Sequence, residues 1–237
     1  MGRYSFQYRQ AMAATQRIAR SEFAERFPLA EWRVIGRCIV ADFSAPTFTA
    51  AVEFVSEVGR AAEAADHHPD IDIRYPGRVR ITLTSHAANG LTEADPSLAQ
   101  SISALAAELG VAVTVNALAS TELAIDAMDI PNVLPFWRAI LGYVNEQPFA
   151  PDGIFDAIVD PLRIGPSLWF QQMDKPRLQR NRIHFDLIVP HDAAEARIAA
   201  AVAAGGTVLS TDAAPAFWVL ADPEGNEICV CTWQGRE

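Results

Sequence analysis

Three of the five histidines lie in one short window of the sequence, at His67, His68 and His86. An imidazole has an unperturbed pKa of about 6.5, so it can both accept and donate a proton near neutral pH. His67 and His68 precede Pro69 at the end of a predicted helix, and His86 follows a predicted strand. We expect all three rings to reach one cleft and to act there in general acid–base chemistry.

The same residues also have purely structural explanations. His67 and His68 could only cap the helix end, where the helix dipole favours a cation by roughly 0.3–1 kcal/mol. Glu63 suits a solvated helix surface, and Asp95 forms a capping box with Thr92. A metal site at the histidine pair is disfavoured, because adjacent residues rarely direct both rings at one ion.

Apolar spacing predicts the elements that position the first two histidines. Residues 32–43 are rich in β-forming residues, which favours a hairpin bent at Gly36. From residue 47, apolar residues recur at steps of three and four, which predicts a helix that Pro69 stops. The residues assigned to its buried face are Phe48, Ala51, Val52, Val55, Val58 and Ala62.

The elements after Pro69 position His86. Residues 71–83 alternate between apolar and polar around Pro76-Gly77, which predicts a hairpin with one buried face. By strand parity His86 lies on the face opposite Leu83 and is displayed to solvent. A second helix is expected from the capping box to Gly110, and one more strand in residues 111–120.

The second half of the chain repeats a pattern. Residues 122–129 are strand-like and lead into a helix ending at Leu141-Gly142, and residues 184–191 lead into a helix over 193–204. Strand-like runs follow each helix, including residues 168–172, 217–220 and 228–232. We interpret this as two copies of a βαβββ unit, because each copy alone would leave one sheet face uncovered.

Composition restricts the classes of function. The 237 residues carry a formal net charge of −10 without a Lys/Arg cluster, so nucleic acid is not an expected partner. An uninterrupted apolar run of the roughly 18 residues needed to span a bilayer is absent, and the N-terminus does not read as a secretory signal. Three cysteines, Cys38, Cys229 and Cys231, favour a reducing cytoplasm over a disulfide framework.

The residues around the histidines carry a family signature. Glu63, His67-His68-Pro69, Tyr75, the strand ending Thr84-Ser85-His86, and Gly90-Leu91-Thr92-Glu93-Ala94-Asp95 resemble the pterin-4a-carbinolamine dehydratase family. The likeness extends from about residue 32 to residue 109. The segment between Tyr75 and His86 is one residue longer than the family pattern, and the Pro76-Gly77 turn can absorb that residue without changing either strand register.

The resemblance implies dehydration of a 4a-hydroxytetrahydropterin without metal or organic cofactor, in a homo-oligomer. His68 and His86 would flank the reacting centre as acid and base, in an order that the sequence leaves open. His67 would assist or hold the pterin, Glu63 and Asp95 would orient the imidazoles or stabilise their charge, and Tyr75 would bind the substrate.

The second half is similar to the glyoxalase/bleomycin-resistance/extradiol dioxygenase superfamily, with its vicinal oxygen chelate fold. The likeness rests on Phe136-Trp137 with Leu141-Gly142-Tyr143, on residues 182–187, and on the run Asp222-Pro223-Glu224-Gly225-Asn226-Glu227. The superfamily places metal ligands on the first and last strands of each half, which nominates Glu122, His184 and Glu227 for a divalent metal. The alternative is a metal-free pocket in which His184 is only a polar wall residue.

The predicted fold class is therefore α+β, with three parts: an N-terminal extension (1–20), a dehydratase-like antiparallel sheet with helices on one face (21–117), and the duplicated βαβββ domain (118–237). The favoured function is a dehydratase with an appended small-molecule-binding domain. One alternative places metal-dependent lyase, isomerase or dioxygenase chemistry in the second domain, with the first domain binding pterin or dimerising. Another is a non-catalytic binding protein.

Overall fold

The computed structural model describes residues 16–114, 120–146, 157–176 and 183–235. The chain divides between Ser120 and Thr121 into two compact units. The boundary expected near residue 117 falls on residues 115–119, outside the described residues, as do residues 1–15 of the expected extension (1–20). Ile18, also within that expected extension, is buried in the core of the N-terminal unit. In the part of the chain that is described, no helix is long and apolar enough to cross a membrane.

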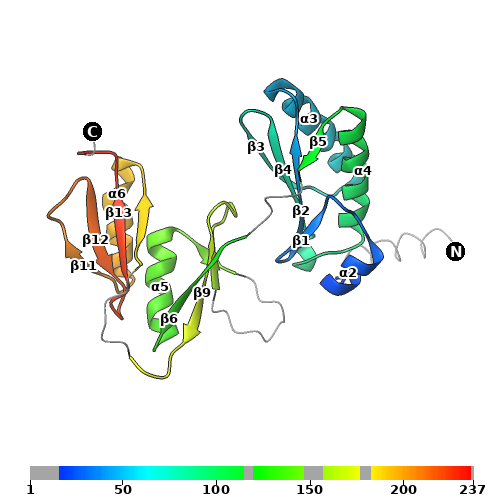
Figure 1. The fold of residues 1–237 in the computed structure, drawn as a ribbon. Helices are drawn as coiled ribbons and strands as arrows, with labels where there is room; N and C mark the ends of the chain where they lie inside the picture. The colour runs from blue at the N-terminus through cyan, green and yellow to red at the C-terminus, as the bar shows by residue number, and fades with distance from the viewer. Residues whose placement is uncertain (1–15, 115–119, 147–156, 177–182, 236–237) are drawn as a thin grey trace. The chain divides into compact units, whose positions relative to one another are not determined.

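The N-terminal unit is an antiparallel sheet with helices on one face (Figure 1). Its strands follow the order β1-β2-β4-β3, and β5 pairs with β2. Helices α3 and α4 pack against each other and enclose a core that includes Phe43, Phe54, Ile81 and Ile102. The elements are β1 (Arg33–Ile35), β2 (Cys38–Ser44), β3 (Asp70–Arg74), β4 (Arg78–Leu83), β5 (Ala112–Thr114), α2 (Arg20–Arg26), α3 (Phe48–Ala65) and α4 (Ala94–Glu108).

Local signals set the limits of these elements, and the glycines act as the sequence predicts, whereas α3 already ends at Ala65, before the predicted stop at Pro69. Gly36 forms the β1–β2 turn at a φ of 59°, and Gly110 follows α4 at a φ of 65°. The Thr47 hydroxyl accepts a hydrogen bond from the Ala50 amide at the start of α3. Asp66 closes that helix in a left-handed conformation, which leaves His67 just beyond its end.

The buried face of α3 differs from the predicted one. Phe48 and Val52 are 50% and 42% exposed, whereas Phe54 is fully buried. Ala51, Phe54, Val58 and Ala62 form the buried stripe. At 3.6 residues per turn, Val52 lies roughly a third of a turn from the centre of that stripe. Spacing by three and four residues therefore also assigned residues at the edge of the stripe to the buried face.

The position of His86 also needs a correction. Strand β4 ends at Leu83, and His86 begins a short 3₁₀ turn, η1 (His86–Ala88), that an isolated bridge between Ser85 and Gly90 closes. His86 is exposed as expected. The reason is the turn, not strand parity, because alternation of faces ends where the extended backbone ends.

The C-terminal unit consists of two βαβββ copies, as predicted. Its two sheets have the matching orders β6-β9-β8-β7 and β10-β13-β12-β11, and the first and last strands of each copy pair in parallel. One apolar cluster, which includes Trp137, Ile140, Leu220 and Val230, draws on both copies. The elements are β6 (Glu122–Ala127), α5 (Ile130–Leu141), β7 (Val144–Asn145), β8 (Ala157–Val159), β9 (Ser167–Gln172), β10 (Phe185–Ile188), η2 (His191–Ala193), α6 (Ala194–Ala203), β11 (Thr207–Ser210), β12 (Phe217–Ala221) and β13 (Glu227–Cys231).

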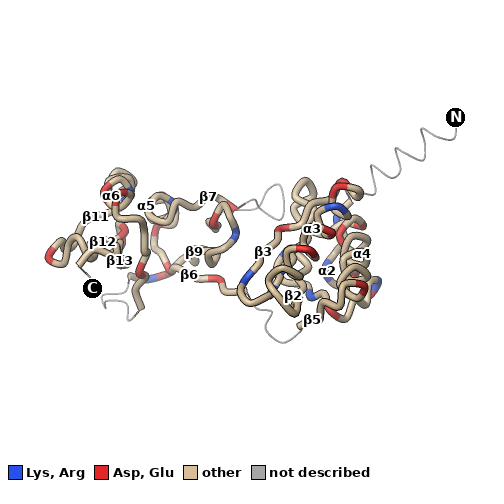
Figure 2. Tube along the Cα trace, turned by 90° about the horizontal axis from the view of Figure 1, so that it is seen from above, with Lys and Arg blue, Asp and Glu red and all other residues tan. Residues whose placement is uncertain are grey.

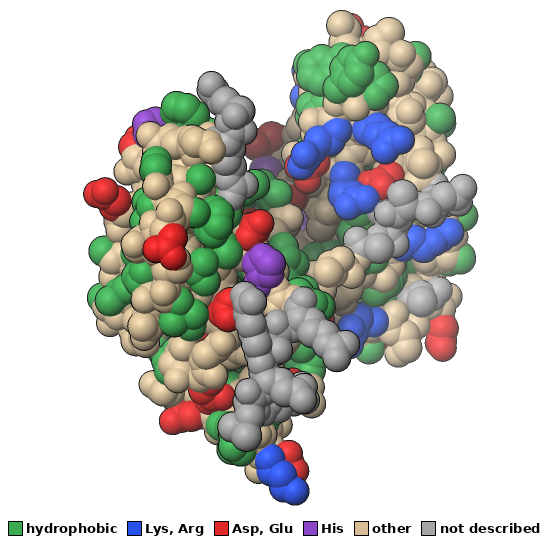
Figure 3. All heavy atoms as spheres, turned by 60° about the vertical axis from the view of Figure 1, so that its left-hand side comes forward, with side chains coloured by type: hydrophobic (Ala, Val, Ile, Leu, Met, Phe, Trp, Pro, Cys, Tyr) green, Lys and Arg blue, Asp and Glu red, His purple; other side chains and the backbone are tan. Residues whose placement is uncertain are grey.

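Charged residues are spread over the elements of both units. In Figure 2 acidic and basic positions are scattered along the trace, and in Figure 3 a group of Lys and Arg side chains has acidic side chains among them. On the sheet face of the N-terminal unit opposite the helices, Arg80 donates two hydrogen bonds to Asp42, at 2.7 and 2.8 Å. These hydrogen bonds raise the pKa of Arg80, so its guanidinium stays charged at any ordinary pH.

Candidate active site

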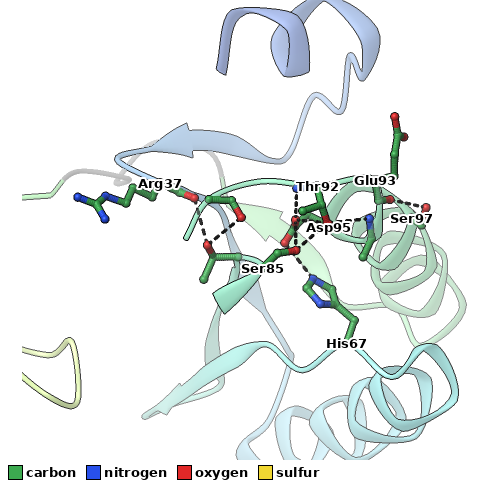
Figure 4. A network of polar contacts seen from close by, with 10 residues as sticks. Arg37, His67, Ser85, Thr92, Glu93, Asp95 and Ser97 are labelled. Carbon is green, nitrogen blue, oxygen red and sulfur yellow. Dashed lines mark hydrogen bonds and ion pairs between the residues drawn. The ribbon is translucent and has the colours of Figure 1, made fainter. Parts of the chain in front are cut away.

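His67 is held by a buried carboxylate from another helix. Its Nε2 atom lies 2.9 Å from Oδ1 of Asp95, in the first turn of α4 (Figure 4). The side chain of His67 is 11% exposed and that of Asp95 is fully buried. A buried carboxylate is costly unless it is paired and hydrogen-bonded, so this contact stabilises both groups where they are.

The second oxygen of Asp95 is bonded just as closely. Oδ2 accepts hydrogen bonds from the Ser85 hydroxyl at 2.9 Å and from the Thr92 backbone amide at 2.7 Å. The Ser85 and Thr92 hydroxyls lie 2.7 Å apart, and both residues are buried. Asp95 thus makes the predicted capping contact with Thr92 through one oxygen and holds His67 with the other.

Ser85 is the member of this network that sequence reasoning missed. A usable signal was present, because the backbone stays extended past the end of β4 as far as Ser85, which places residue 85 on the same side as Ile81 and Leu83. A serine at a position expected to be buried needs a hydrogen-bond partner. That partner, Asp95, lies ten residues further along the chain.

The second histidine is held only loosely. His68 Nε2 lies 3.2 Å from Oε1 of Glu63, and both side chains are exposed. An exposed pair of this kind contributes little to stability, typically about 0–1 kcal/mol. His68 is therefore near the predicted carboxylate and can still be reached by solvent and ligand.

The β3–β4 hairpin decides which predicted residues lie near one another. Asp70 pairs with Thr82, so the start of β3 lies beside the end of β4. His68 and His86 consequently flank the same end of the hairpin. Tyr75 follows the other end of β3 and is 87% exposed. The length of β3, on the order of 15 Å, lies between Tyr75 and the histidines, and the substrate-binding role of Tyr75 stays a prediction.

The C-terminal unit contains a cavity of about 760 Å³ between its two βαβββ copies. This volume is within the range of small-molecule sites. Apolar side chains and acidic groups share its wall: Leu123, Ile125, Met128, Trp137, Met173, Ile183 and Phe185, with Asp126, Glu224 and Glu227. The Glu224 carboxylate accepts hydrogen bonds from the amides of Met128 and Asp129, which ties the two copies together beside the cavity.

The possible metal ligands differ from the predicted set. Among the described residues, donor atoms of His184, Asp186 and Cys229 all lie within 4.8 Å of one another. Glu122 and Glu227 do not belong to that group. The parallel register of β10 and β13 explains the change, because it sets Asp186 directly beside Cys229, whereas Glu122 pairs with Ser167 in the other sheet.

The Cys229 thiol loses its proton less readily than an unperturbed thiol. Burial, followed by the charge of Asp186, raises its pKa to about 11. The thiol is therefore protonated at neutral pH. A metal ion at this group would have to displace that proton.

The fold and the site define a histidine-bearing α+β domain followed by a duplicated βαβββ domain. Residues 16–105 match the family model "Pterin 4 alpha carbinolamine dehydratase", and residues 122–231 match "Glyoxalase-like domain". A proposed pterin-4-alpha-carbinolamine dehydratase of Chloroflexus aurantiacus is 48% identical over 87 residues, which are 36% of this chain and 92% of the relative. The chain belongs to the pterin-4-alpha-carbinolamine dehydratase family through its N-terminal unit.

Solved structures resemble each unit. A transcriptional coactivator/pterin dehydratase from Brucella melitensis is 32% identical, with 38% of this chain and 99% of that chain covered and a TM-score of 0.36. A glyoxalase/bleomycin resistance protein/dioxygenase family enzyme from Burkholderia phytofirmans is 17% identical, with 48% and 98% covered and a TM-score of 0.39.

Proposed function

We propose that the N-terminal unit dehydrates a 4a-hydroxytetrahydropterin to the quinonoid dihydropterin, with His67, His68 and His86 as its acid–base groups. The observation that carries this proposal is the His67–Asp95 contact at 2.9 Å. It holds one imidazole at the end of the hairpin that His68 and His86 also flank. Membership in the dehydratase family supplies the substrate class.

The chemistry is an elimination of water from a carbinolamine. The bond between C4a and its hydroxyl oxygen breaks, and the neighbouring ring nitrogen loses its proton, so that a carbon–nitrogen double bond forms. An imidazolium would donate a proton to the departing hydroxyl, and a neutral imidazole would accept the proton of the ring nitrogen. Each such transfer contributes typically about 10²- to 10⁴-fold in rate.

The proposal assigns separate tasks to the carboxylates. Asp95, fully buried, holds His67 in place and orients its ring. Glu63, which lies 3.2 Å from His68 and is exposed, would orient that ring once substrate covers both groups. No step requires a metal or an organic cofactor.

A coupled assay tests this function. The 4a-hydroxytetrahydropterin is generated in situ and the quinonoid product is followed by its absorbance. His68→Ala and His86→Ala are each expected to lower turnover at least about 100-fold, because each removes one proton-transfer group. His191→Ala removes an exposed histidine of the C-terminal unit and serves as the matched control, with activity unchanged.

The stability and the activity of these variants test separate parts of the proposal. Both variants should unfold at the wild-type denaturant concentration, since the rings of His68 and His86 are exposed. Near-wild-type dehydration by both would reject the assignment of these histidines. A wild-type chain without dehydratase activity would reject the function itself.

A second proposal concerns the C-terminal unit. We infer that it binds a small molecule in its cavity, because the volume and the mixture of apolar and acidic wall residues suit one. The donor set of His184, Asp186 and Cys229 fits a divalent ion with nitrogen, oxygen and sulfur ligands. These three residues are not among those that line the cavity, so the ion site is proposed separately from the small-molecule site.

We also propose a cytoplasmic homo-oligomer. Phe48 and Val52 lie one turn apart on α3 and are half-exposed, which leaves an apolar strip that a second copy could cover. Three cysteines without a disulfide among them are consistent with a reducing compartment.

A further inference from the structure

The Asp95 carboxylate is bonded from three separate segments of the chain (Figure 4). Ser85 follows β4, Thr92 precedes α4, and His67 follows α3. The Thr92 amide can only donate, and the Ser85 hydroxyl lies 2.9 Å from the same oxygen, Oδ2. Oδ1 is left for His67, at 2.9 Å.

This arrangement is the basis for assigning the tautomer of His67, because Oδ1 of Asp95 faces Nε2 of the ring. An ionised carboxylate has no proton to give and only accepts hydrogen bonds. The ring nitrogen that faces it, Nε2, must therefore carry a proton. In a neutral imidazole that assignment leaves Nδ1 as the hydrogen-bond acceptor.

We propose that Ser85 and Thr92 are positioning residues for the dehydratase centre, which act through Asp95 to hold His67 as the Nε2–H tautomer with Nδ1 as its proton acceptor. This proposal rests on the proposed function only for the reaction in which His67 takes part. The chemical role of His67 is then that of a base or a hydrogen-bond acceptor in its neutral form.

Helix capping alone does not account for the Ser85 hydroxyl. At the start of α4 the Thr92 amide donates to Asp95 and the Ala94 amide donates to the Thr92 hydroxyl, and neither bond involves Ser85. Ser85 comes from a different segment and is 8% exposed, at a place where an alanine would avoid burying a hydroxyl. Its bonds to Asp95 and to the Thr92 hydroxyl instead fix the rotation of the carboxylate.

The decisive measurement is the tautomer of His67 by long-range ¹H–¹⁵N NMR of the full chain, with kcat and KM measured in parallel. We expect Nε2–H in the wild type. Ser85→Ala should add Nδ1–H to the mixture and lower kcat about tenfold, the equivalent of one net hydrogen bond, with KM changed less than about twofold. Ser85→Thr restores a hydroxyl and should restore both readouts.

Ser97→Ala is the matched control. Ser97 lies two residues after Asp95 on α4, and its hydroxyl donates to the Glu93 carbonyl instead of the network. Its removal should change neither the tautomer nor kcat. Thr92→Val is a second test should Ser85→Ala not fold, because valine keeps the backbone amide and loses only the hydroxyl.

The outcomes separate the two proposals. If Ser85→Ala and Thr92→Val leave His67 as pure Nε2–H, the positioning role is overturned, whatever the activity. If they shift the tautomer in a chain that has no dehydratase activity, the positioning role stands and the proposed function fails. An equal shift in Ser97→Ala would mean a general loosening of α4 and would also overturn the proposal.

Discussion

The imidazole of His67 and the carboxylate of Asp95 meet at 2.9 Å although they are 28 positions apart in the chain. The contact joins the end of α3 to the first turn of α4 inside a nearly dry environment. Local sequence explains His67 as a helix cap and Asp95 as part of a capping box. Their contact joins the two residues in one polar centre.

Asp95→Asn tests how much this polar centre contributes to turnover and to stability. Asparagine is similar in shape but carries no charge, and its amide can present a donor to His67. We expect turnover to fall about 100-fold and the free energy of unfolding to fall by about 1–3 kcal/mol, because buried donors lose a charged acceptor. Glu53→Gln, an exposed charge loss on α3, should change neither quantity. Wild-type activity in Asp95→Asn would show that the carboxylate has no part in the chemistry.

The apolar strip on α3 predicts an effect on assembly. If the chain assembles through this strip as proposed, replacing Phe48, which is 50% exposed, with Asp should give a 25.8 kDa monomer in light scattering after size exclusion. The physical reason is the cost of burying an unpaired carboxylate at an apolar interface. Glu53→Lys on the same helix is the control. An unchanged mass for Phe48→Asp would place the interface elsewhere.

The proposed metal ligands predict a spectroscopic signal. Co²⁺ added to the full chain should give a thiolate-to-metal absorption band if Cys229 binds the ion, because sulfur ligands produce intense charge-transfer transitions. Cys229→Ser and His184→Ala should abolish the band. Cys38→Ser, in the N-terminal unit, should leave it intact. A band that persists in Cys229→Ser would show that Cys229 does not bind the ion.

The raised pKa of Cys229 predicts a dependence of stability on pH. In the folded state the pKa of the Cys229 thiol is about 11, against 9.0 for an unperturbed thiol. Between these values the folded state binds more protons than the unfolded state, so its stability falls as the pH rises. Urea unfolding should therefore show the advantage of wild type over Cys229→Ala shrinking from pH 9 to pH 11. A constant difference would mean that the thiol is not shielded.

Local patterns in the sequence determined the secondary structure and the place of the histidines along it. The period of α3, the turn glycines Gly36 and Gly110, and the repeated strand–helix pattern depend on residues within a few positions of one another, which is why they could be predicted. The signature around His67, His68 and His86 likewise identifies the family from the sequence alone.

Tertiary structure alone decided which of these residues meet. The pairing of His67 with Asp95, the burial of Ser85 beside them, and the grouping of His184 with Asp186 and Cys229 depend on how helices pack and how strands pair. Periodicity identifies the face that a side chain occupies, but it does not give the register between strands or the atom that a buried oxygen will face. Those follow from closing distant segments around a shared core, where each buried polar group must find its partner.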